Sequence, residues 1–99
     1  MRHERKGSAV TAFITGELDH FSAQQVRREL DALIAQPGVK TLILDFGEMT
    51  FMDSSGIGVI LGRYREMRSR GGSVCVRNMN AQVDKVFTLS GLRQVIQII

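Results

Sequence analysis

Runs of β-branched and apolar residues mark the strands of this chain. They cover residues 9–15, 41–46 and 73–77, and a polar segment at 2–6 and an apolar one at 94–99 complete the set. The run at 41–46 is apolar at consecutive positions in its middle. That pattern is typical of a strand whose sheet carries helices on both faces.

Apolar residues at spacings of three and four predict three helices between these strands. The first is bounded by a capping box at Ser22 and Gln25 and by Pro37. The second runs over about 54–70, and the third follows Asn80, which can cap it. The residues expected to face the core are Val26, Leu30, Leu33 and Ile34 in the first helix, Ile57, Ile60, Leu61, Tyr64 and Met67 in the second, and Val83, Val86 and Phe87 in the third. Strands alternating with helices predict a single α/β domain with a largely parallel sheet.

Composition restricts the class of protein. The 99 residues suffice for one small domain, and a hydrophobic share of 43% is ordinary for a soluble globular chain. No apolar run approaches the roughly 20 residues of a membrane span, and the charged N-terminus does not read as a signal peptide. We therefore expect a cytoplasmic protein in which Cys75, the only cysteine, is a buried reduced thiol. The net charge of +3 gives only a slight preference for acidic partners.

The most distinctive segment is 50–64, where an acid and two hydroxyls meet the predicted start of the second helix. Asp53 directly precedes Ser54 and Ser55. A hydroxyl in this position can cap free backbone N–H groups. An exposed hydroxyl there is also a good phosphorylation site, because the helix dipole tolerates a phosphate that an acidic partner surface would repel. From the residues alone, Ser54 is either a cap or a switch.

Small residues lie along one flank of the second helix. Gly58 and Gly62 are four apart, and each costs roughly 1 kcal/mol relative to alanine inside a helix. We therefore expect a compensating close contact, either with the sheet or with a partner. Val59 is predicted to point away from the core beside this flank, and we interpret the flank as a docking patch. The arginines of the helix, Arg63 among them, are expected on a solvated face.

Other chemistry has little support in the sequence. A serine nucleophile elbow needs glycine two positions earlier, where Met52 stands, and His20 has no orienting third group. Gly56, Gly58 and Gly62 miss the dinucleotide-binding spacing by one position. No residues have metal-ligand spacing, and an aromatic share of 6% is too low for nucleic-acid stacking. We expect no enzyme, no metal or other cofactor, and no direct binding to nucleic acid or membrane. The alternative is a domain that binds a nucleotide, or slowly hydrolyses it, at this loop.

Residues 51–64, from Phe-Met-Asp-Ser-Ser-Gly to Gly-Arg-Tyr, resemble the phosphorylation segment of STAS-domain anti-sigma factor antagonists of the sporulation stage II AA type. Residues 16–20 are similar to that family's first loop, and residues 87–92 to its late helix end. The resemblance covers nearly the whole chain. It implies a STAS fold, a small, mixed and mostly parallel sheet with helices mainly on one side, rather than on both. Family members usually continue into another helix, so we expect one to be absent after Ile99.

The resemblance also implies a function. The unphosphorylated protein would bind an anti-sigma factor that is also a serine kinase, and so release a sporulation sigma factor. ATP-dependent phosphorylation of Ser54 would end this binding, and a PP2C-type phosphatase would restore it. A STAS module in a stress-response or transport complex is a further alternative. The residues expected in the docking surface are Asp19, His20, Asp53, Ser55, Gly56, Gly58, Val59, Gly62 and Arg63.

Overall fold

The computed structural model describes residues 1–99 and contains every strand and helix that the sequence predicts, together with two further strands. The strands are β1 (His3–Lys6), β2 (Ala9–Phe13), β3 (Gly16–Leu18), β4 (Thr41–Asp45), β5 (Met49–Met52), β6 (Ser73–Arg77) and β7 (Gln97–Ile98). The helices are α1 (Ala23–Ile34), α2 (Ser54–Ser69) and α3 (Ala81–Leu89), followed by a 3₁₀ turn, η1 (Leu92–Gln94).

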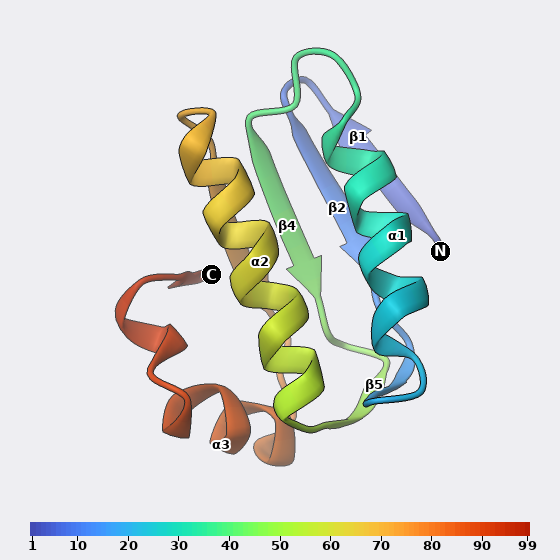
Figure 1. The fold of residues 1–99 in the computed structure, drawn as a ribbon, viewed down its shortest axis with the longest axis vertical. Coiled ribbons are helices and arrows are strands. Elements are labelled where there is room, and N and C mark those ends of the chain that lie inside the picture. The colour runs from blue at the N-terminus through green and yellow to red at the C-terminus, as the bar shows by residue number, and fades with distance from the viewer.

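The main sheet has the strand order β1-β2-β4-β6-β7, with only β1 antiparallel to its neighbour. Helices α1 and α2 lie side by side across one face of it (Figure 1). The register places Val10 beside Leu42 and Leu42 beside Val74, and this buried row packs under the helices. The predicted mostly parallel sheet with helices mainly on one side is therefore confirmed.

The expectation of helices on both faces, drawn from the apolar run at 41–46, is wrong. Side chains alternate between faces along a strand, so Ile43 lies on the face opposite Leu42. It is half-buried beside its register partners Thr11 and Cys75. Side chains of the neighbouring strands thus cover part of Ile43, so this face needs no helix to hold an apolar residue. Cys75 is a buried free thiol, and burial raises its pKa.

The predicted helix faces do form the core between the sheet and the helices. The fully or nearly buried members are Leu30, Leu33 and Ile34 in α1, Ile60 and Met67 in α2, and Val83 and Phe87 in α3. The remaining predicted residues, Val26, Ile57, Leu61, Tyr64 and Val86, are half-buried and pack against that cluster. The helical spacing therefore identified the correct face of each helix.

The start of α1 differs from the predicted capping box. The hydroxyl of Ser22 donates to the backbone oxygen of Glu17 at 2.8 Å and accepts from the backbone N–H of Asp19 at 3.0 Å. Gln25 bonds to Glu29 on the helix surface instead of reaching back to Ser22. The serine closes the turn before the helix, because that turn brings the end of β3 within its reach.

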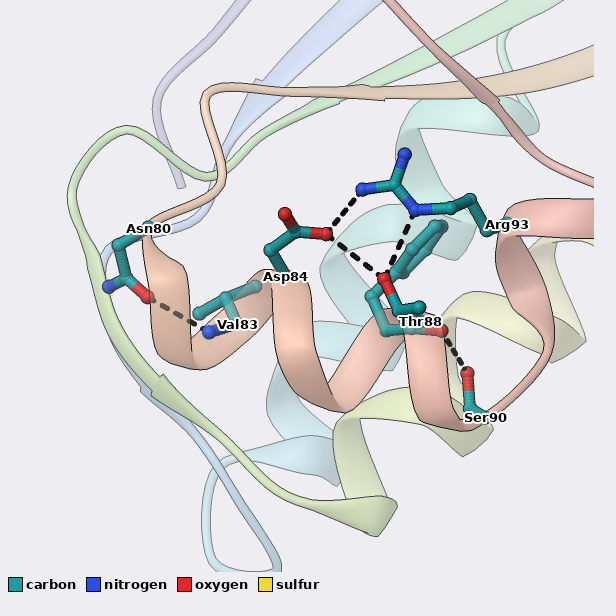
Figure 2. A network of polar contacts seen from close by, with 7 residues as sticks. Asn80, Val83, Asp84, Thr88, Ser90 and Arg93 are labelled. Atoms are coloured by element: carbon teal, nitrogen blue, oxygen red, sulfur yellow. Dashed lines mark hydrogen bonds and ion pairs between the residues drawn. The ribbon is translucent and has the colours of Figure 1, made fainter.

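Polar contacts hold both ends of α3 (Figure 2). The predicted cap is confirmed, since Asn80 Oδ1 accepts from the backbone N–H of Val83 at 2.9 Å. Asp84 accepts hydrogen bonds from Thr88 and Arg93, and Arg93 Nε donates to Thr88 Oγ1 at 3.0 Å. The bond from Arg93 lowers the pKa of Asp84. This network closes the chain into η1, which leaves only β7 of the strand expected at 94–99.

Candidate functional site

The two strands that the sequence did not predict, β3 and β5, build the site. They pair in parallel, with Leu18 opposite Met52. Because parallel strands end at the same edge, the loops that follow them lie together, at the lower end of the molecule in Figure 1, where α1 and α2 begin. The backbone N–H of Asp53 donates to the oxygen of Leu18 at 3.3 Å. The structure thus brings the Asp19 loop next to the Asp53–Ser54 segment.

Asp53, and not Ser54, caps α2. Its backbone is extended, and its Oδ1 accepts from the N–H of Ser55 at 2.8 Å. Ser54 is the first residue of the helix, is exposed, and its hydroxyl forms no hydrogen bond. Ser55 is half-buried. Capping by Ser54 is therefore ruled out, and its hydroxyl remains free for chemistry.

Gly56 sets the position of this helix start. A Cβ on it would lie 2.7 Å from Met52 Cγ, 2.9 Å from Leu18 Cγ and 3.0 Å from the Leu18 backbone oxygen. The first turn of α2 can pack this closely on the ends of β3 and β5 only because the side chain is missing. Gly56 is itself buried, so it positions Ser54 and lies beneath the surface.

Two amide side chains at the start of α3, from its cap Asn80 and from Gln82, hydrogen-bond to the backbone of β5. Gln82 Oε1 accepts from the N–H of Met52 at 3.0 Å, and Gln82 Nε2 donates to the oxygen of Met52 at 2.9 Å. Asn80 Nδ2 also donates to the oxygen of Met49 at 2.9 Å. Gln82 thereby replaces the bonds of a missing neighbouring strand one residue before Asp53. Sequence analysis missed this role, because nothing near Gln82 in the chain indicates the contact.

A buried carboxylate holds the turn that leads from β4 to β5. Asp45 accepts hydrogen bonds from the N–H of Gly47 at 2.8 Å, from Arg77 Nε at 2.8 Å and from Asn78 Nδ2 at 3.1 Å. Burial alone would raise the pKa of Asp45, but these donors outweigh it and lower the pKa. The group is fully satisfied within the fold, which indicates a structural role.

The Asp19 loop is ordered by its own carboxylate. Asp19 Oδ1 accepts from the backbone N–H groups of Phe21 and Ser22, both at 3.0 Å, and the bond from Ser22 is the main cause of its lowered pKa. His20 is exposed, and its ring meets that of Phe21 edge to face at 5.8 Å. Phe21 is 92% exposed at this edge, an exposed aromatic that sequence analysis did not select.

The glycine flank of α2 faces open space. A Cβ on Gly58 or Gly62 would meet no atom within 4 Å, so packing on the sheet does not explain these glycines. Instead they line a groove of about 490 Å³ between α1 and α2. Its other lining residues are Ala23, Gln24 and Arg27 from α1 and Ser55, Val59 and Arg63 from α2.

Two predictions about this flank are wrong. The sequence predicts that Val59 points away from the core, but it is only 6% exposed and belongs to the core cluster. It predicts Arg63 on a solvated face, but this arginine is only 7% exposed. The helical pattern of α2 indicates only which face meets the sheet, whereas α1 also packs beside α2, where Val59 and Arg63 are covered although Gly58 and Gly62 stay open. Arg63 Nε lies 3.1 Å from Asp31 Oδ1 of α1. Both residues line the groove rather than projecting from the surface.

A sequence model of the STAS domain matches residues 1–99. The chain belongs to the STAS family. This STAS domain is 36% identical to the anti-sigma F factor antagonist of Paenibacillus polymyxa over 98 residues, which cover 99% of this chain and 82% of that protein. Among solved structures it is similar to the anti-sigma factor antagonist SpoIIAA in its unphosphorylated form, with a TM-score of 0.84 and 36% identity over 99% of this chain and 86% of that one.

A second solved structure, the Bacillus cell fate determinant SpoIIAA in its phosphorylated form, matches with a TM-score of 0.75 and 35% identity, over 99% of this chain and 89% of that one. The predicted family and fold are therefore confirmed. These relatives are named as antagonists of anti-sigma factors and not as enzymes. No helix here has both the length and the hydrophobicity to span a membrane. No group of three or more His, Cys, Asp or Glu residues is arranged to hold a metal ion.

Proposed function

We propose that this STAS domain is an anti-sigma factor antagonist switched at Ser54. The unphosphorylated form binds an anti-sigma factor with serine kinase activity, which frees a sporulation sigma factor. ATP-dependent phosphorylation of Ser54 ends the binding, and a PP2C-type phosphatase restores it. The similarity to an anti-sigma F factor antagonist and to SpoIIAA structures in unphosphorylated and phosphorylated forms supports this proposal.

The free hydroxyl of Ser54 is the observation that carries the proposal. Since Asp53 already caps the helix and the hydroxyl of Ser54 makes no hydrogen bond, a phosphate on that hydroxyl breaks no contact of the fold. A phosphate adds about −1.5 to −2 charges at a helix start, where the dipole favours negative charge by ~0.3–1 kcal/mol. The fold therefore survives the modification.

The same phosphate would weaken binding to a partner whose surface is acidic. One pair of like charges 4 Å apart costs ~1 kcal/mol in water and ~4 kcal/mol at an effective dielectric constant of 20. Placed in an interface, a phosphate facing an acidic group would thus weaken binding substantially. We assign the docking surface to the exposed edge around His20 and Ser54 and to the adjoining groove with Gly58 and Gly62. Asp19, Asp53 and Gly56 hold this surface in shape from below.

Phosphorylation by the cognate anti-sigma factor tests the assignment of the serine. The protein is incubated with that kinase and ATP and is then analysed by mass spectrometry, beside the matched variants Ser54→Ala and Ser55→Ala. We expect one phosphate on wild type and on Ser55→Ala, and none on Ser54→Ala, because Ser54 is the exposed member of the pair and Ser55 is half-buried. Full phosphorylation of Ser54→Ala would refute the assignment.

A further inference from the structure

The groove between α1 and α2 contains a buried cation with unused hydrogen-bond donors. Arg63 keeps only 7% of its accessible surface, yet its Nε and Nη1 atoms form no hydrogen bond. Nε forms an ion pair with Asp31 Oδ1 at 3.1 Å, but the N–H does not point at that oxygen. A buried donor without a partner destabilises the folded state, and more strongly when the group is charged. The site is therefore incomplete in the isolated chain.

The charges around Arg63 do not cancel. Arg27 also approaches Asp31, with its Nε 3.8 Å from Oδ2. Two guanidinium groups thus share one carboxylate, which leaves a single excess positive charge in the groove. Further along the helix, Arg70 and Glu66 form their own ion pair at 3.5 Å and add no net charge.

The groove also has room for a side chain from another molecule. Gly58 and Gly62 leave open space where any other residue would project, although glycine is a poorer helix former than alanine. The groove begins at Ser55, directly after Ser54 in the chain, so it is continuous with the proposed docking surface.

We propose that this groove receives an aspartate or glutamate side chain of the protein partner, bound by Arg63 with help from Arg27. The inference rests on the proposed function, in which the partner is the anti-sigma factor. A carboxylate matches the single excess charge, whereas a nucleotide triphosphate would bring three or four negative charges. Nε and Nη1 of Arg63 are covered in the isolated chain, so the carboxylate would bind by turning the guanidinium toward the groove, where these idle donors would join a charged pair. A phosphate on Ser54, one residue before the Ser55 that lines the groove, would repel this carboxylate, which connects the switch to the release of the partner.

Calorimetric titration with the purified cognate anti-sigma factor tests the groove. The variant Arg63→Met keeps the aliphatic stem and removes the charge, and Arg65→Met changes an exposed arginine of the same helix as a matched control. We expect Arg63→Met to weaken binding by about tenfold or more, because a buried charge pair is lost, and Arg65→Met to bind within about twofold of wild type. Equal affinity for Arg63→Met and wild type would overturn the proposal and leave the antagonist function standing. A wild-type protein that does not bind would overturn both.

A second variant tests the groove independently, in case Arg63→Met does not fold. Gly58→Leu leaves every charge in place and puts a good helix former where a Cβ meets nothing, so circular dichroism should show an intact fold. The leucine fills the groove, and we expect binding to weaken by about tenfold or more here too. Wild-type affinity in a folded Gly58→Leu would overturn the proposal. So would tight binding of ATP or GTP to the free protein that Arg63→Met abolishes, since that result assigns the groove to a nucleotide.

Discussion

The same glycine-to-alanine change should have opposite effects at two positions of α2. Gly56 and Gly58 are two residues apart in one helix, and both gain helix propensity when alanine replaces them. They differ in what the new methyl group meets. At Gly58 it meets no atom within 4 Å, and at Gly56 it lies 2.7 Å from Met52 Cγ and 3.0 Å from the backbone oxygen of Leu18. This pair isolates close packing from propensity.

The magnitudes follow from these distances. Gly58→Ala should stabilise the protein by about 0.5–1 kcal/mol, because the helix gains alanine's propensity and no contact opposes it. Gly56→Ala must push apart a fully buried methionine and a strand backbone, and overpacking of this kind costs about 1–3 kcal/mol. Because both variants gain the same helix propensity, they should differ by the overpacking cost of about 1–3 kcal/mol, which is roughly 4 °C or more in Tm for a domain of this size.

Urea unfolding followed by circular dichroism measures the difference. The chain has no tryptophan, so helix ellipticity is a better signal than fluorescence. We expect similar m-values for both variants, a midpoint above wild type for Gly58→Ala and a midpoint below it for Gly56→Ala. Equal midpoints for the two variants would show that α2 does not start against β3 and β5 as described, and the position of Ser54 would then be wrong.

Three further predictions concern the groups around the site. Gln82→Met should lower the free energy of unfolding in urea by about 1–2 kcal/mol, because the backbone N–H and oxygen of Met52 both lose their partners. An unchanged urea midpoint would show that these two bonds do not stabilise the fold. Because folding lowers the pKa of Asp45, its carboxylate should stabilise the fold fully above the unfolded pKa of about 4, and this stabilisation should be lost as pH falls through the folded pKa. In Asp45→Asn, the free energy of unfolding should therefore change less with pH between about pH 5 and 2. A profile as steep as that of wild type would contradict this assignment. The thiol of Cys75 should react slowly with a disulfide reagent in the native protein and quickly in urea, since it is buried with a raised pKa, and equal rates would refute its burial.

The elements with strong periodicity could be predicted from the sequence. Helix α2 carries apolar residues over four turns, and its start at Ser54 and its buried face follow from that spacing. Strand β5 could not be found in this way, because its two buried residues, Met49 and Met52, enclose two exposed ones and break the alternation of a strand. It forms through pairing with β3, which is distant in the chain.

The site was predicted only in part, for similar reasons. The segment Asp53-Ser54-Ser55 offers three possible caps in a row, and only the extended backbone of Asp53 decides between them. The burial of Val59 and Arg63 depends on where α1 lies, which the pattern of α2 does not encode. Local sequence thus located the functional segment, and long-range packing determined which of its side chains are free.

The affinity of the cognate anti-sigma factor for two variants of one residue tests the central claim most directly. Ser54→Asp places a negative charge at the start of α2, and Ser54→Ala removes the hydroxyl without adding charge. Both should unfold at urea midpoints close to that of wild type, because the hydroxyl makes no bond in the fold. The account predicts that Ser54→Ala binds like wild type and Ser54→Asp binds about tenfold more weakly or worse. Equal affinities for the two folded variants would contradict it.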